Sequence, residues 1–149
     1  MTLFDETPPS SAPRWFIIRA DGAARGNPGP AGIGAVLRDE RGETVVKLSK
    51  YIGRATNNEA EYQAIIMALE AAVQLGATAV HLYIDSELLA RQLQGQYRVK
   101  SPNLQPLYRR AFELLRRFSP ALVTHVTRDG NREADALANK AIDEALRRH

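Results

Sequence analysis

Residues 21–37, DGAARGNPGPAGIGAVL, place an aspartate directly before a segment rich in glycine and proline, which leads into another apolar run. A hairpin turn needs only about two to five residues, whereas this connection uses about eight. It also carries Arg25 and Asn27 among its glycines. The stretch therefore predicts a strand that ends at Asp21, a connection that does more than reverse the chain, and a second strand.

The pattern on either side of this stretch predicts a mixed α/β fold. Strands are expected over residues 14–21, 79–85 and 121–127, a hairpin over 32–53 with its turn at 39–42, and helices over 57–75, 87–94, 103–118 and 132–148. In this order, three successive strands form an antiparallel meander and helical crossovers then add parallel strands. We expect a five-stranded mixed sheet flanked by helices.

Composition limits the class of protein. The 149 residues are 44% hydrophobic, enough for one domain, which we place at residues 14–149 after a disordered, proline-rich extension over residues 1–13. The absence of cysteine excludes disulfides, thiolate metal sites and a cysteine nucleophile, and only three histidines are present. Any metal ligands should therefore be oxygens, which favours magnesium or manganese. Without a signal peptide or long apolar span, we expect a cytoplasmic monomer that does not bind a membrane.

Two aspartates end strands that are otherwise apolar. By alternation, Asp21 shares a face with Ile17 and Arg19, and Asp85 shares one with His81 and Tyr83. An isolated charge at a strand end is usually a solvated turn residue. Two on neighbouring parallel strands favour a shared site, because functional groups gather at the carboxyl ends of such strands.

The helix expected over residues 57–75 offers three glutamates. Thr56 and Glu59 fit a capping box, which gives Glu59 a structural role. Glu70 falls on the wetter side and is expected to be solvated. Glu61 shares the apolar stripe that should pack on the sheet, where a carboxylate is costly unless something positive meets it. Glu61 is therefore the functional candidate.

The last helix supplies the fourth candidate, Asp135, in a first turn where the helix dipole favours an anion. The alternative is that Asp135 only complements the helix dipole. By spacing alone, Glu133 is an equally possible functional carboxylate. Three or four converging carboxylates would repel one another and raise their pKa values. Divalent cations remove that conflict, and a pair of them is the usual clamp for in-line phosphoryl transfer.

Four motifs, DGAARGNPGPAGIGAVL, TNNEAEYQAI, YIDS and NREADALA, together resemble type 1 ribonuclease H, from about residue 14 to the C-terminus. The resemblance implies a ribonuclease H-like fold and cleavage of the RNA strand of RNA–DNA hybrids to 5′-phosphate and 3′-hydroxyl ends. It maps the family's metal ligands onto Asp21, Glu61, Asp85 and Asp135. It also implies two Mg²⁺ ions per site with substrate, with Mn²⁺ as a substitute.

The resemblance also explains the glycine-rich segment. The family lays it across the minor groove, where backbone groups and small polar residues touch RNA 2′-hydroxyls, and glycines permit such an approach. The implied contact residues are Asn27, Asn57 and Asn58, with Arg25 and Thr56 as phosphate contacts. From the residues alone, turn and cap chemistry is the alternative for the asparagines.

The chain departs from the best-known bacterial pattern in ways that resemble a compact archaeal-like branch, some members of which also cut double-stranded RNA. It lacks the basic, tryptophan-rich insertion, although Arg91, Arg98, Lys100, Arg109, Arg110, Arg116 and Arg117 could form a phosphate track. His125 is expected to be structural, and Arg128 to replace the family's loop histidine. Double-stranded RNA cleavage and a non-catalytic hybrid-binding module remain the alternative functions.

Overall fold

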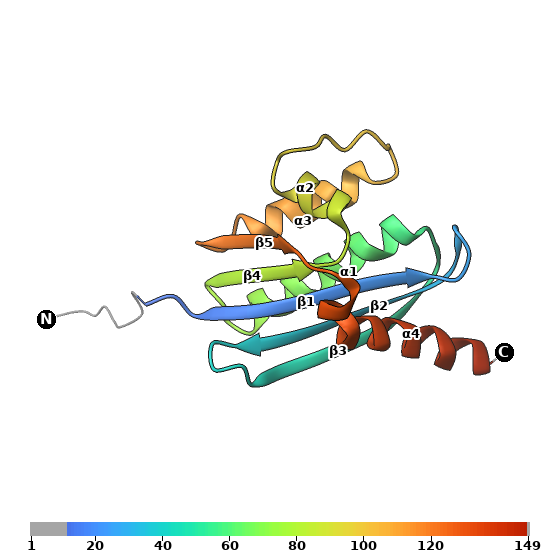
Figure 1. The fold of residues 1–149 in the computed structure, drawn as a ribbon, viewed down its shortest axis with the longest axis horizontal. Coiled ribbons are helices and arrows are strands. Elements are labelled where there is room, and N and C mark those ends of the chain that lie inside the picture. Colours follow the sequence, from blue (N-terminus) through green and yellow to red (C-terminus); the bar gives the residue numbers. More distant parts are fainter. Residues whose placement is uncertain (1–11, 149) are drawn as a thin grey trace, which may run out of the picture.

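The computed structural model describes residues 12–148 and has ten elements in this range (Figure 1). Residues 1–11 of the predicted extension, and His149, lie outside the described residues. The elements are β1 Trp15–Ala24, β2 Gly29–Asp39, β3 Thr44–Ala55, α1 Asn57–Gln74, β4 Ala79–Ile84, α2 Glu87–Leu93, α3 Gln105–Leu115, β5 Ala121–His125, the 3₁₀ turn η2 Arg128–Asn131 and α4 Arg132–Arg147.

The five strands form one mixed sheet in the order β3-β2-β1-β4-β5, which confirms the predicted fold class. The β1–β2 and β2–β3 pairs are antiparallel, whereas β1–β4 and β4–β5 are parallel. β1 therefore lies at the centre, where the meander meets the crossover strands (Figure 1).

The connection after β1 is shorter than the sequence predicted. β1 continues to Ala24 and β2 begins at Gly29, so that only residues 25–28 form the turn. The backbone N–H of Arg25 donates to Pro30 O at 2.8 Å, and Ala24 pairs with Ala31. The glycines and alanines continue the antiparallel ladder, and Asp21 lies inside β1 rather than at its end, which corrects the expectation.

The helices differ from expectation mainly at their ends. α3 begins at Gln105 rather than at residue 103, because Pro106 in its first turn fits a helix start. It ends at Leu115, three residues before the predicted end, and β5 ends at His125, two before. The turn η2 was not predicted. Among residues 12–148, no helix combines the length and apolar character needed to cross a membrane.

Helices cover both faces of the sheet. α1 packs on β1 and β2 and against α3, while α4 packs on β2, β3 and β1 from the other side (Figure 1). Two glycines permit close contact: a Cβ at Gly22 would collide with the backbone of Ala60 and Glu61 in α1, and one at Gly34 with Ala134 in α4. The main core lies between the sheet and α1, with Phe16, Ile18, Leu69 and Leu82 fully buried.

We expect Gly22→Ala to destabilise the protein by about 1–3 kcal/mol, because the new methyl group meets helix backbone that cannot rotate away. Chemical denaturation measures the change. Gly130→Ala is the matched control, since its added carbon would meet only the Val126 side chain, at 3.3 Å. Equal denaturation midpoints for Gly22→Ala and the unaltered protein would contradict this packing.

Candidate active site

Three carboxylates converge where β1 runs past the end of β4. Asp21, Glu61 and Asp85 each offer an oxygen atom, and these atoms all lie within 4.8 Å of one another. The register explains the meeting of the aspartates: Arg19 pairs with Tyr83, so two residues further along, Asp21 lies level with Asp85, the residue after Ile84. Glu61 reaches them from α1, whose backbone touches β1 at Gly22.

The start of α1 separates the roles of its first two glutamates, as the sequence predicted. The hydroxyl of Thr56 accepts from the backbone N–H of Glu59 at 3.1 Å, and the Glu59 carboxylate accepts from the N–H of Thr56 at 2.8 Å. This capping box occupies Glu59. Glu61, one residue before buried Tyr62, is left to face the carboxylate cluster.

Asp135 and Arg128 line the same cavity, which has a volume of about 460 Å³. Asp135 lies in the first turn of α4. Arg128 lies at the start of η2 and is exposed. All five residues predicted to be catalytic therefore border one cavity, with Asp21 at its most buried point, 6% exposed.

The surroundings of Asp21 and Glu61 favour the neutral forms of these two carboxyl groups in the absence of a cation. Burial, together with the charges of Asp85 and Glu61, raises the pKa of Asp21 to about 9. Burial and Asp85 raise the pKa of Glu61 to about 8, although the guanidinium of Arg128 opposes this rise. The cluster thus holds more negative charge than its protein surroundings neutralise.

Asn27 and Asn57 each accept a hydrogen bond from a backbone N–H group in the neighbouring motif. Asn27 Oδ1 accepts from the N–H of Asn57 at 3.1 Å, and Asn57 Oδ1 accepts from the N–H of Ala24 at 3.0 Å. These bonds join the β1–β2 turn to the start of α1 beside the cavity. They are the turn and cap chemistry considered above. Neither Nδ2 group has a hydrogen-bond partner within residues 12–148, so each can still donate to another molecule.

Several other predicted residues have protein partners. Arg25 does not point to the cavity but forms an ion pair with Asp143 of α4 at 2.7 Å. Glu133, the competitor of Asp135, is bound by Arg38 at 2.7 Å and Lys47 at 2.8 Å. Glu70 was expected to be merely solvated and instead pairs with Arg110 at 3.0 Å, because α1 and α3 pack together.

The expectation that His125 is structural stays a prediction. His125 is exposed at the end of β5, the edge strand, which also contacts α2. The neighbouring Val123, on the same side of β5, does pack against the core. Alternation assigned both residues to one face correctly but could not show where the covered part of that face ends.

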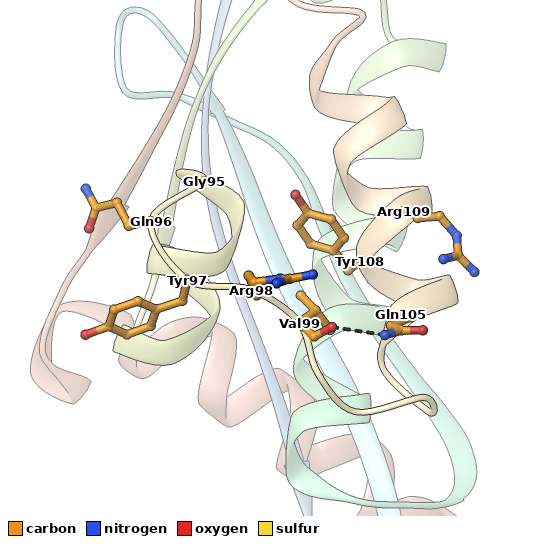
Figure 2. Close-up of a pocket in the computed structure, with 8 residues that line it drawn as sticks. All are labelled: Gly95, Gln96, Tyr97, Arg98, Val99, Gln105, Tyr108 and Arg109. Carbon is orange, nitrogen blue, oxygen red and sulfur yellow. Dashed lines mark hydrogen bonds between the residues drawn. The ribbon is translucent and has the colours of Figure 1, made fainter.

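Three of the seven basic residues predicted to form a phosphate track line hollows beside the segment between α2 and α3, namely Arg98, Lys100 and Arg109. Two adjoining hollows, of about 430 and 560 Å³, flank the segment between α2 and α3. Figure 2 shows the first, with Arg98 and Tyr108 facing it and Arg109 at its border. Lys100 lines the second, which extends to Asn58 at the start of α1. Within the described chain, no acidic residue lines either hollow.

Sequence reasoning missed Asn131 and Asn139. Asn131 is fully buried, and its Nδ2 donates to Ala20 O at 2.9 Å, beside Asp21. Its place before α4 could have marked it as a helix cap, but its side chain makes no cap bond. Asn139 lies one helical turn after Asp135 and donates to it. Only the i, i+4 spacing could have identified this second contact.

Comparison with known proteins identifies the relatives of this chain. Residues 19–141 match a family described as "Reverse transcriptase-like". The chain is 50% identical over 125 residues to "Ribonuclease HI" of Halobacterium salinarum, covering 84% of this chain and 63% of that protein. It is 48% identical to "Bifunctional protein Rv2228c" of Mycobacterium tuberculosis, over 87% of this chain and 36% of that one.

A solved structure extends the likeness to the fold. LC11-RNase H1, determined in complex with an RNA/DNA hybrid, superposes with a TM-score of 0.83 at 46% identity, covering 88% of this chain and 99% of that one. The chain spans about two thirds and one third of the two curated relatives above. Residues 19–141, which match the family, include Asp21, Glu61, Asp85 and Asp135. By its sequence and its fold, this protein belongs to the type 1 ribonuclease H family.

Proposed function

We propose that this protein is a metal-dependent endoribonuclease that hydrolyses the RNA strand of RNA–DNA hybrids and leaves 5′-phosphate and 3′-hydroxyl ends. The observation that carries the proposal is the convergence of Asp21, Glu61 and Asp85 within 4.8 Å in a chain of this family. The hybrid held by LC11-RNase H1 supports the choice of substrate.

The residues present fit divalent cations. The cluster offers only oxygen ligands, which suits Mg²⁺ and Mn²⁺. Burial, together with the neighbouring carboxylates, raises the pKa values of Asp21 and Glu61, so that a nearby positive charge would be strongly favoured. We assign Asp21, Glu61, Asp85 and Asp135 as ligands of two ions. The chemistry that such a pair supplies is activation of the attacking water and stabilisation of the leaving oxygen.

The protein's own groups would bind and orient the hybrid. Asn27 and Asn57 hold the turn against α1 through their Oδ1 atoms and leave their Nδ2 groups to donate to 2′-hydroxyls, which distinguish RNA from DNA. Asn58 lies at the end of the hollow that contains Lys100, so the minor-groove contacts and the basic hollows form one continuous surface. Arg128 would contribute a positive charge at the edge of the cavity during turnover.

Cleavage assays with labelled RNA–DNA, DNA and RNA duplexes, each with Mg²⁺, Mn²⁺ or EDTA, test the reaction. We expect the hybrid to be cut only with a metal, and Asp21→Asn to lose at least about 10³-fold in rate while still binding the hybrid. Glu144→Gln, an exposed carboxylate in α4, is the control. Faster cutting of the RNA duplex would favour the double-stranded RNA alternative, and binding without any cleavage the non-catalytic one.

The stability of the metal-free protein should fall as pH rises. Because the folded-state pKa values of Asp21 and Glu61 exceed their unfolded values of about 4, folding favours the protonated forms. The stability that the protonated forms of Asp21 and Glu61 contribute is complete below about pH 4 and is lost towards pH 8 to 9. The free energy of unfolding of Asp21→Asn should therefore rise relative to that of the unaltered protein by up to about 1.4 kcal/mol per pH unit between pH 5 and 8.

Urea denaturation in EDTA at several pH values measures this gap, with Glu144→Gln as the control. Saturating Mg²⁺ should narrow the gap, since a cation that binds the folded site stabilises the unaltered protein more than the variant. A gap that is independent of pH would show that the charge cluster is not destabilising.

The basic hollows can be tested through salt dependence. Replacing both Lys100 and Arg109 with alanine should weaken hybrid binding and reduce the slope of log K against log salt by about 1–2. The matched control is the double replacement of Arg116 and Arg117, which removes the same charge from residues that line neither hollow. Equal slopes for the two double variants would place the phosphate track elsewhere.

A further inference from the structure

Among the four assigned ligands, Asp135 alone is exposed, whereas Asp21 is buried and Glu61 and Asp85 are half-buried. An exposed carboxylate loses rotamer freedom when a cation fixes it, and this loss opposes binding. Any contact that directs the side chain beforehand therefore improves the site. Asn139 provides one: its Nδ2 donates to Asp135 Oδ1 at 3.3 Å and to the Asp135 backbone carbonyl at 3.1 Å.

The amide of Asn139 can donate in this direction only if its oxygen faces the other way. Arg25 fixes that orientation, because its Nη2 donates to Asn139 Oδ1 at 3.2 Å and to the backbone carbonyl of Asn139 at 3.4 Å. The same Nη2 atom pairs with Asp143 Oδ1 at 2.7 Å. A continuous chain of contacts thus runs from Asp143 through Arg25 and Asn139 to Asp135.

We propose that Asn139 is a positioning residue for Asp135, and that Arg25, held by Asp143, keeps the amide of Asn139 in its donating orientation. This inference rests on the proposed function, because it concerns the carboxylate assigned there as a ligand. It also gives Arg25 a role different from the phosphate contact that the family resemblance implied.

The neutral amide between the two charged groups has a physical consequence. A guanidinium bound directly to Asp135 would form a strong charge-assisted pair and compete with a cation for the carboxylate. An amide donor aims the carboxylate but leaves its charge unpaired. Since Arg25 has its own partner in Asp143, its charge is largely satisfied away from the cavity. The arrangement can therefore orient the ligand without neutralising it.

Binding of Mn²⁺ alone, measured by titration calorimetry without nucleic acid, tests the inference apart from catalysis. We expect Asn139→Ala to weaken Mn²⁺ binding about 10-fold, the scale found when partners of metal ligands are removed. The Mg²⁺ concentration that gives half-maximal cleavage should rise by a similar factor, with little change in hybrid affinity in EDTA. Asn103→Ala, in the exposed α2–α3 segment, is the control.

Asp143→Asn separates the positioning role from a phosphate contact, because Asp143 is exposed on the outer part of α4 and its replacement releases Arg25. In the positioning role, this variant also weakens Mn²⁺ binding, by a smaller factor than Asn139→Ala. If Arg25 instead serves the substrate, the released guanidinium should tighten hybrid binding and leave Mn²⁺ binding unchanged, which would overturn the inference.

A double-mutant comparison completes the test. Arg25→Ala should weaken Mn²⁺ binding in the unaltered protein but have no further effect on it in the Asn139→Ala background, because the contact it supports is already gone. Equal effects in both backgrounds would contradict the chain of contacts. If the unaltered protein neither binds Mn²⁺ nor cleaves hybrids, the proposed function and this inference both fail. If it does both and Asn139→Ala matches it, only the inference fails.

Discussion

Mutual repulsion among carboxylates at the end of β4 is the constraint that the rest of the structure has to withstand. Asp21 is buried beside Asp85 and Glu61, and burial together with the neighbouring negative charges raises the pKa values of Asp21 and Glu61. Side chains free to move would separate and become solvated. They stay together because their backbones belong to elements fixed by the core: a central strand, the strand parallel to it, and a helix with an almost wholly buried inner stripe.

Small residues set how closely those elements approach. Gly22 lets β1 touch the backbone of α1 beside Glu61, and Gly34, which pairs with Asp21 across the ladder, lets β2 touch α4 at Ala134, the residue before Asp135. Each glycine therefore lies next to a carboxylate of the cluster. The glycines that looked like loop signals in the sequence are chiefly a means of packing two helices tightly on opposite faces of one sheet.

The role of these glycines shows which features the sequence alone could predict and which it could not. Strand alternation, the capping box and the apolar stripe of α1 identified the clustered carboxylates, because each depends on local periodicity or spacing. Contacts between distant segments were not accessible in that way. Nothing near Arg25 indicates Asp143, and nothing near Glu70 indicates Arg110. The exposure of His125 likewise depends on which part of the sheet face remains uncovered.

The position of α4 after every strand of the sheet has a consequence for biosynthesis. Asp135 comes from this last helix, whereas Asp21, which lines the same cavity, comes from the first strand. A nascent polypeptide from which α4 has not yet emerged could pair all five strands but would lack Asp135. The carboxylate cavity would then be completed last, once α4 has emerged and packed on the sheet.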